Sequence, residues 1–338
     1  YGDLPEQTPG VRVLSISKRL PTALRLILFT IRLWQEARHA DALTVCDGAA
    51  VGLPSLMVSR LCHLPLIRCV MENETRERFV RETHLEISDE VFPRYPLPDR
   101  KLRIINWLQV FILKHATRVI VPSSFFKQLL TDVFAVLPER MEILAYPPEP
   151  LRKLPFPIIA EPHSVYIPWH HMTPQDFVET LDALEILRSR VSDIRCIIVD
   201  QSPLTPEQHQ MVLAKGLRDH LRCLGPISSA ERSSLLLSCD VCYIPQTTSP
   251  HLEMMYQAYA ARIVVIATHT PHHEEGIDHH HSGYLIPPHN PKALASAIEM
   301  LLPPSEVRSR LIMGGTAFLA EHASWEAHVP ALIAHHAL

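Results

Sequence analysis

Histidines and carboxylates are concentrated in one short stretch of the chain, THTPHHEEGIDHHHSGYL, which runs from Thr268 to Leu285. Imidazole and carboxylate groups are ligands for zinc, so a metal site is one interpretation of this stretch. However, adjacent histidines on an extended loop point in divergent directions, and neither His272–His273 nor His279–His281 contains the i, i+4 pair of a zinc-binding helix. We therefore predict no metal site, and the histidines need another interpretation.

Seven cysteines are spread from Cys46 to Cys242. An odd, scattered set does not form a disulfide framework and is typical of a reducing compartment. The C-x-x-C pair of Cys239 and Cys242 has no second pair and no suitably spaced histidine. It spans the end of a predicted helix and the start of an apolar strand, which predicts packing rather than redox or zinc chemistry.

Length and composition limit the class of protein. The chain has 338 residues, 47% of them hydrophobic and 20% charged, which predicts a globular protein of two domains. A formal net charge of −4, without any Lys/Arg block, argues against nucleic acid as a partner. No apolar run approaches the ~18 residues of a membrane span, and the N-terminus has no signal-peptide layout. We predict a cytoplasmic protein that is at most peripheral at the inner face of the membrane.

Short apolar, β-branched runs alternate with segments of helical period, which predicts parallel strands joined by helices. The strands predicted in the first half are Val11–Ser17, Ala42–Cys46, Leu66–Met71, Thr117–Val121 and Met141–Ala145. Those predicted in the second half are Ser164–Pro168, Ile194–Val199, Val241–Ile244, Ile263–Ala267 and Tyr284–Ile286. A proline-rich segment at 145–157 interrupts the alternation. We therefore predict domains at 1–147 and 161–318, a linker at 148–160 and a C-terminal helix at 319–338.

Two predicted helices combine basic and apolar side chains. In the segment Ser17–Arg38, Arg25 and Arg32 lie off an apolar helical face that consists of Leu24, Ile27, Leu28, Ile31 and Trp34. We expect this face to pack on the sheet, and the alternative is a helix that lies on a membrane surface. The segment Lys101–His115 is apolar nearly all round after its first turn, which predicts burial.

The run Ser228–Leu302 resembles the nucleotide-sugar half of glycosyltransferase family 4. The matching features occur in order and without a gap: Asp240, Ala258, Ala260, Val265-Ile266-Ala267, Glu275, Gly283, Leu285, Pro287-Pro288 and Leu294–Ile298. In the first half, Ala116–Ser123 resembles the family's A-D-x-V-I-V-P-S motif, and Pro138–Met141 resembles its P-E-K-I. The resemblance covers essentially the whole chain. It implies the GT-B fold, an α/β architecture in which two Rossmann-like, doubly wound domains face each other across a cleft.

The resemblance also implies roles for the two domains and a gap at the start of the chain. The N-terminal domain would bind the acceptor, and the C-terminal domain would bind the nucleotide sugar. Tyr1-Gly2-Asp3 resembles the end of the family's second strand. We therefore expect the first β-α-β unit of the N-terminal domain to be missing, together with the central strand of its sheet.

Donor-binding positions of the family fall on unusual residues here. The Arg and Lys that neutralise the leaving diphosphate fall at His170 and Gln175. The glutamates of the E-x7-E motif fall at Ser249 and Gln257, and Glu253 lies on the same helical face as Gln257. Ser249 with Pro250 still has the pattern of a helix N-cap. The remaining donor-binding positions are Ser202, His269, His272 and Glu275.

The histidine-rich stretch is therefore interpreted as the donor-cleft loop, in which imidazoles replace glycines that let the backbone approach a ligand. On the acceptor side, Glu72–Glu77 stands where relatives carry G-D-x-A-W-E. The catalytic residues stay unassigned, and the candidates are Glu253 and Glu72.

The resemblance implies a retaining glycosyltransferase of cell-envelope polysaccharide biosynthesis. Its donor substrate would be a nucleotide sugar, its acceptor a glycan or a lipid-linked molecule, and no cofactor is expected. The replaced motif residues keep a second hypothesis open, a catalytically inactive homologue that acts as a binding or scaffold protein. Fold alone does not decide between these hypotheses, so whether the chain is an enzyme stays open.

Overall fold

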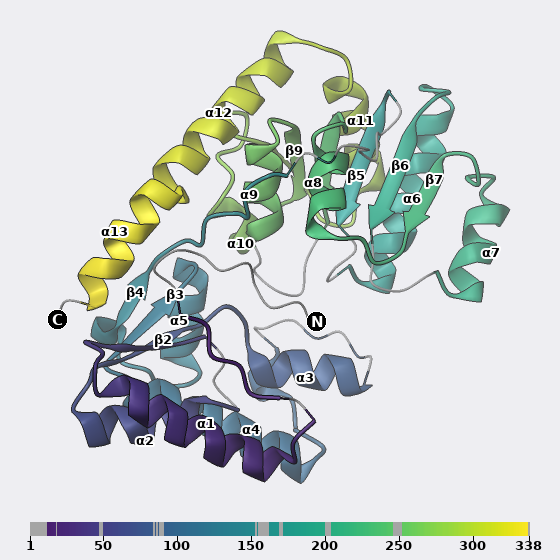
Figure 1. Cartoon of the computed structure of the whole chain (residues 1–338). Helices are drawn as coiled ribbons and strands as arrows, with labels where there is room; N and C mark the ends of the chain where they lie inside the picture. The colour runs from purple at the N-terminus through teal and green to yellow at the C-terminus, as the bar shows by residue number, and fades with distance from the viewer. Residues whose placement is uncertain are drawn as a thin grey trace.

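The computed structural model describes residues 12–17, 19–46, 50–83, 85, 87, 91–152, 154, 162–168, 172–199, 204–245 and 252–336. Two α/β domains, each built around a parallel sheet, lie one above the other in Figure 1. This arrangement is the GT-B architecture that the family resemblance implies. The domain limits predicted from the proline-rich segment stay a prediction.

The N-terminal sheet has the order β1-β2-β3-β4, and all its described pairs are parallel. Its strands are β1 (Leu43–Val45), β2 (Leu66–Cys69), β3 (Arg118–Val121) and β4 (Met141–Ile143). The helices of this half are α1 (Thr22–Ala37), α2 (Gly52–Cys62), α3 (Glu74–Thr83), α4 (Arg100–His115) and α5 (Ser124–Asp132), with short 3-10 turns at Phe92–Arg94 and Pro138–Arg140.

The C-terminal sheet has the order β10-β9-β8-β5-β6-β7, which places β5 and β8 at its centre. Its strands are β5 (Ser164–Pro168), β6 (Arg195–Val199), β7 (Leu221–Leu224), β8 (Val241–Ile244), β9 (Val264–Thr268) and β10 (Tyr284–Ile286). The helices are α6 (Pro174–Arg188), α7 (Pro206–Ala214), α8 (Ser229–Leu236), α9 (Glu253–Ala260), α10 (Pro271–Glu274), α11 (Pro291–Leu301), α12 (Glu306–His322) and α13 (Trp325–His336).

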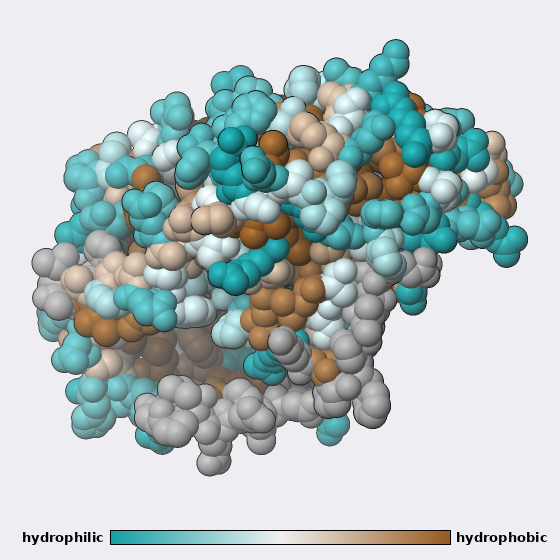
Figure 2. Space-filling view, turned by 90° about the horizontal axis from the view of Figure 1, so that it is seen from above, coloured by the Kyte–Doolittle hydropathy of each residue, from teal (hydrophilic) through white to brown (hydrophobic). Residues whose placement is uncertain are grey.

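Both faces of the C-terminal sheet are covered, as expected of parallel strands with apolar runs. Val165 and Ile167 pack on one face with residues of α6 and α11, whereas Tyr166 packs on the other with residues of α8 and α9. Cys239 and Cys242 are buried in the second of these cores, so the prediction that they serve packing is confirmed. Figure 2 looks down on this domain and shows hydrophilic side chains over most of its rim.

Side-chain caps fix where several helices begin. Thr173 accepts a hydrogen bond from the Asp176 N–H at the start of α6, and the Asp176 carboxylate accepts one from the Thr173 N–H. Ser123 caps α5 by accepting from the Phe126 N–H, which confirms the cap predicted from the sequence. Such caps contribute about 1 kcal/mol each to helix stability.

The chain returns to the N-terminal domain at its end. In Figure 1, α13 runs from the C-terminal domain down to the sheet of the N-terminal domain. The Trp325 indole N–H donates to the Pro148 carbonyl at 3.2 Å, and His328 Nδ1 lies 2.9 Å from the Ala145 carbonyl oxygen. Leu332 packs against the apolar cluster of Ile67, Cys69 and Ile120.

The structure corrects some of the predicted elements. Residues 12–17, the described part of the strand predicted at Val11–Ser17, do not form a strand, and β7 was not predicted. The predicted apolar face of α1 does not pack on the sheet, because the helix contacts its neighbours through Leu33 and Ala37 instead. Four residues of the predicted face are exposed: Leu24, Ile27, Ile31 and Trp34.

Helix α4 also differs from its prediction. Leu102, Ile105 and Ile112 are buried, but Ile104 and Trp107 face solvent. Only part of the apolar surface of α4 is buried, and the rest forms an exposed apolar face. Across the described part of the chain, we find no helix with the length and hydropathy needed to cross a membrane.

Candidate functional site

The carboxyl ends of the two sheets are brought together by a contact between domains. Glu275, in the connection that follows β9, accepts hydrogen bonds from the backbone N–H groups of Ser124 at 2.8 Å and Phe125 at 2.7 Å. Both N–H groups belong to the first turn of α5, which follows β3. Because the carboxyl ends of parallel strands share one edge of a sheet, this contact joins the edges at which open α/β sheets bind ligands.

A cavity of about 430 Å³ lies at this edge of the N-terminal sheet, beyond the ends of β1 and β2. Its lining combines three carboxylates, two guanidinium groups and apolar side chains: Cys46, Ala50, Met71, Glu72, Glu74, Glu77, Arg78, Arg81 and Ile105. We call this the acceptor-side pocket, after the role that the family resemblance predicts for this domain. A mixed lining of this kind can bind a polar molecule that also has an apolar part.

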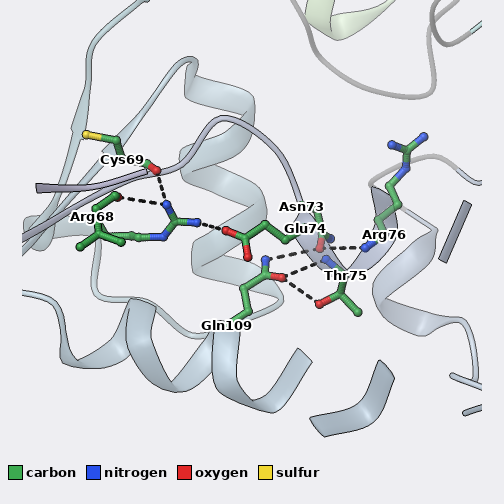
Figure 3. Close-up of polar contacts among 8 residues, drawn as sticks. Arg68, Cys69, Asn73, Glu74, Thr75, Arg76 and Gln109 are labelled. Atoms are coloured by element: carbon green, nitrogen blue, oxygen red, sulfur yellow. Dashed lines mark hydrogen bonds and ion pairs between the residues drawn. The ribbon is translucent and has the colours of Figure 1, made fainter. Parts of the chain in front are cut away.

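The position of Glu74 at this pocket depends on a buried arginine. Arg68 in β2 is 2% exposed, and its guanidinium donates to the carbonyls of Val45 and Cys69 and pairs with Glu74 (Figure 3). A buried charge is tolerated only when it is paired and hydrogen-bonded, and this network meets that condition. The ion pair therefore fixes the start of α3 against the end of β2.

A second polar network holds the first turn of α3 to α4. Gln109 of α4 accepts from the Thr75 backbone N–H at 3.1 Å and from its hydroxyl at 2.8 Å, as Figure 3 shows. Its amide NH₂ donates to Asn73 Oδ1, which also accepts from the Arg76 N–H. The Asn73 Nδ2 group is buried and has no hydrogen-bond partner among the described residues. These contacts join the first turn of α3, which carries Glu74 and Glu77 of the pocket, to α4.

Glu72 is the carboxylate of the pocket whose protonation is most altered. Burial raises the pKa of Glu72, and the nearby Glu77 and Glu74 raise it further, while Arg76 and Arg81 oppose the shift. A carboxyl group whose pKa moves toward neutral pH is better suited to exchange a proton with a hydroxyl group. The structure therefore places an acceptor-side candidate from the sequence, Glu72, in an environment suited to acid–base chemistry.

The donor-side candidates lie in the C-terminal domain, and several of them are paired with each other. Glu253 is exposed at the first residue of α9 and accepts from the buried Gln257 amide at 2.9 Å. Gln175 is exposed on α6 and donates to Glu179 at 2.8 Å. Three further donor-side candidates, His170, Ser202 and Ser249, lie outside the described residues. The N-cap prediction for Ser249 needs correction, since α9 begins only at Glu253 and has Leu252 at its N-cap.

The histidine-rich stretch is not the extended loop that was expected. Residues 271–274 form the short helix α10, because Thr270 caps it and Pro271 occupies its first turn. His272 is buried, its ring lies edge-on to Phe125 with centroids 3.7 Å apart, and its Nδ1 has no hydrogen-bond partner in the described part of the chain. Burial lowers the pKa of His272 to about 4, with a smaller effect from His273.

The neighbouring histidines also have defined partners. His273 is buried with its Nδ1 at 2.5 Å from the Thr268 carbonyl oxygen, and burial lowers its pKa. The exposed His269 pairs with Glu274, and His279 Nδ1 accepts from the Leu285 N–H. Within the described residues, no three His, Cys, Asp or Glu side chains are grouped to hold a metal ion.

Comparison with known proteins identifies the C-terminal half. Residues 173–317 match the family model described as Glycosyl transferases group 1. These residues are therefore similar to the group 1 glycosyl transferases. The match extends from the N-cap of α6 into α12, and it confirms the family resemblance at the level of group 1.

Solved structures show that the rest of the chain completes the same fold. A glycosyltransferase from Rickettsia africae has a TM-score of 0.67 at 14% identity, over 96% of this chain and 83% of that one. HepE from Anabaena, solved with UDP and glucose, has a TM-score of 0.66 at 15% identity, over 92% and 82%. A sucrose-phosphate synthase from Thermosynechococcus elongatus has a TM-score of 0.64 at 15% identity, over 94% and 78%. Among curated proteins, none matches the sequence significantly.

Sequence reasoning did not identify two residues beside the acceptor-side pocket. Arg68 interrupts the apolar run Leu66–Val70, and a charge inside a buried strand is the signal that could have revealed it. Cys46 follows β1 directly and lines the pocket. Its signal was its position at the carboxyl end of a strand.

Proposed function

We propose that this protein is a retaining glycosyltransferase that transfers a sugar from a nucleotide sugar to a glycan or lipid-linked acceptor in cell-envelope polysaccharide biosynthesis. The nucleotide sugar is a substrate in this proposal, and no cofactor takes part. The group 1 match over residues 173–317 supports a donor site in the C-terminal domain. The complexes of HepE with UDP and with glucose show that the same fold accommodates these ligands in a neighbour.

The observation that carries the proposal is the acceptor-side pocket with Glu72, opposite the group 1 domain. Arg78 and Arg81 line the same pocket and supply positive charge, and Glu72 supplies a carboxyl group with a raised pKa. We infer that Glu72 accepts a hydrogen bond from the reacting hydroxyl of the acceptor. Removal of that proton makes the oxygen a better nucleophile for the sugar carbon.

An inactive homologue that binds without catalysis is the second candidate function. The hydrogen bonds Gln257–Glu253 and Gln175–Glu179 favour it, because groups at predicted donor positions already satisfy each other. Glu275 likewise has its carboxylate engaged by α5. A nucleotide would have to replace these partners, which costs binding energy.

Thermal unfolding with and without nucleotide sugars separates the two candidates from an unrelated role. We expect a saturable rise of the midpoint with one member of a panel of UDP, GDP and ADP sugars, since a ligand that binds only the folded state stabilises it. Transfer to an acceptor or hydrolysis of the bound sugar would then distinguish the enzyme from the inactive homologue. No response to any nucleotide sugar, together with a large response to zinc, would exclude both.

We also propose that the protein contacts the inner face of a membrane through the segment Ser17–Arg38, while it remains cytoplasmic. The exposed Ile27 and Trp34 on α1 support this, as does the exposed Trp107 on α4. Helices α1, α2 and α4 carry only Glu36 as an acid, against seven basic residues: Arg25, Arg32, Arg60, Arg100, Lys101, Arg103 and Lys114. Apolar side chains combined with positive charge suit an anionic lipid surface.

Sedimentation with lipid vesicles tests the membrane contact. We expect the full chain to bind vesicles that contain phosphatidylglycerol and to bind pure phosphatidylcholine much more weakly. The double variant Ile27→Glu, Ile31→Glu should lose this binding, because it puts charge on the exposed face of α1. Met211→Glu with Leu213→Glu, on exposed positions of α7, is the matched control. Equal binding by both double variants would contradict the proposal.

A further inference from the structure

Two cysteines lie side by side at the rim of the acceptor-side pocket. Strands β1 and β2 are parallel, and Val45 pairs with Arg68 in their register. One step further along both strands, Cys46 and Cys69 are therefore opposite each other, and their thiols are hydrogen-bonded to each other. Neighbouring strands are about 4.8 Å apart, which is within the range of Cα separations that a disulfide spans.

The two thiols differ in access and in charge. Cys46 is exposed and lines the pocket, whereas Cys69 is 3% exposed. The hydrogen bond from Cys69 lowers the pKa of Cys46 to about 6, with the Arg68 guanidinium adding to the shift and burial opposing it. The same hydrogen bond and burial raise the pKa of Cys69. Cys46 is thus an accessible thiolate at neutral pH with a protonated thiol in contact with it, the arrangement of oxidation-sensitive cysteine pairs.

We propose that Cys46 and Cys69 form a reversible disulfide upon reaction with hydrogen peroxide, with Cys46 as the attacking thiol and Cys69 as the resolving thiol. The Cys46 sulfur attacks one peroxide oxygen, the O–O bond breaks, and the other oxygen leaves as water after protonation. The resulting sulfenic acid is attacked by the Cys69 sulfur, so that the S–S bond forms as the S–O bond breaks. The Cys69 proton leaves with the hydroxyl as a second water. Two thiols are oxidised and one peroxide is reduced.

The disulfide would change the pocket as well as the thiols. Cys69 is adjacent to Arg68, whose guanidinium bonds the Cys69 carbonyl and the Glu74 carboxylate. A bond that draws Cys46 onto Cys69 therefore moves one wall of the pocket relative to the start of α3. Disulfide formation does not require the proposed transferase function. Only an effect of the disulfide on acceptor binding rests on that function.

Peptide mapping of the full chain after peroxide treatment tests the proposal. We expect a linked pair of peptides that contain Cys46 and Cys69, a mass lower by two hydrogen atoms, and recovery of both thiols with dithiothreitol. Cys46→Ser and Cys69→Ser should each abolish the linked pair. Cys62→Ser, in the same domain, should leave it intact. A linked pair that involves other cysteines, or sulfinic acid at Cys46 without any linkage, would overturn the assignment.

Alkylation provides a measurement on the unaltered protein, which does not depend on how well the variants fold. With limiting iodoacetamide at neutral pH, Cys46 should react roughly tenfold faster than Cys62, because Cys46 is exposed and has a lowered pKa, whereas Cys62 is partly buried. Equal rates at the two positions would contradict the attacking role of Cys46. If peroxide instead lowers the Tm without forming the linkage, the proposal also fails, whatever the outcome of the nucleotide-sugar experiment.

Discussion

The carboxyl edges of the two sheets differ in the partners that their polar side chains contact. At the N-terminal edge, buried Arg68 and Gln109 hold the backbone of α3, and several charged groups that line the pocket are paired within this domain: Glu74 with Arg68, Glu77 with Arg76, and Arg78 with Glu82. At the C-terminal edge, the described polar groups are mostly paired with one another or, like Glu275, with the other domain. The comparison indicates that the N-terminal edge encloses a cavity lined by its own charged groups, whereas the C-terminal edge uses the Glu275 carboxylate to bind the other domain.

Removal of the buried charge of Arg68 should have the largest effect, and it should destabilise the N-terminal edge. Arg68→Met removes the buried ion pair with Glu74 and the hydrogen bonds to the Val45 and Cys69 carbonyls, so we expect a loss of about 3–5 kcal/mol in the free energy of unfolding. Urea unfolding measures it. Arg78→Met, which removes the partly exposed pair with Glu82, is the control and should cost less than about 1 kcal/mol. Similar losses for both would show that the buried network is not what stabilises this edge.

Substitution of Glu72 tests whether the acceptor-side pocket takes part in the transfer reaction. Glu72→Gln keeps the shape of the side chain but cannot accept a proton, so we expect kcat to fall roughly 100-fold with little change in stability. Glu82→Gln, a carboxylate of α3 that does not line the pocket, should keep full activity. Transfer assays with the nucleotide sugar found by thermal unfolding provide the measurement. Full activity of Glu72→Gln would remove Glu72 from the mechanism.

Low pH should destabilise the protein by protonating His272, which packs against Phe125 of the other domain. The pKa of His272 is about 4 in the folded protein and about 6.5 when unfolded, so the unfolded state binds more protons between these values. Stability is therefore complete above pH 6.5 and falls by about 3 kcal/mol as the pH decreases toward 4. His272→Phe should flatten this part of the pH profile of Tm. An unchanged slope in that variant would assign the acid sensitivity to other groups.

The interdomain hydrogen bonds of Glu275 should give the smallest effect. Glu275→Gln replaces two charge-assisted bonds to the first turn of α5 by weaker ones, for an expected loss of about 1–2 kcal/mol. Glu274→Gln, whose exposed carboxylate pairs only with His269 among the described contacts, is the matched control. Thermal unfolding reports the loss, and small-angle scattering reports whether the domains separate. If the two variants behave alike, Glu275 does not hold the domains together.

Most of the fold could be predicted from the sequence, because buried parallel strands have a strong local pattern. Nine predicted strands are present within about two residues of their expected limits, and the Ser123 cap is where it was expected. Strand β7 was not predicted, because Arg222 is exposed and breaks its apolar run. Helix α1 was wrongly predicted to pack on the sheet for a different reason. An amphipathic pattern indicates that a helix has an apolar face, but it does not indicate what packs against that face.

The candidate site was less predictable, because its contacts join residues far apart in the chain. Glu275 was selected as a donor-binding residue, and that role stays a prediction. Its contact with α5 links residues about 150 positions apart, so no local pattern could indicate it. The Arg68–Glu74 pair is close in sequence, but only the turn between β2 and α3 brings the charges together.

The return of α13 to the N-terminal domain has a mechanical consequence. The chain crosses between the domains twice, and the two crossings are fastened to each other where Trp325 donates to Pro148 and His328 contacts Ala145. Because the two crossing segments contact each other, they connect the two domains at one place. The Glu275 contact is a separate link between the domains, made by the connection after β9 and the first turn of α5. The two domains are therefore linked at two places, once where the crossing segments meet and once through the Glu275 carboxylate.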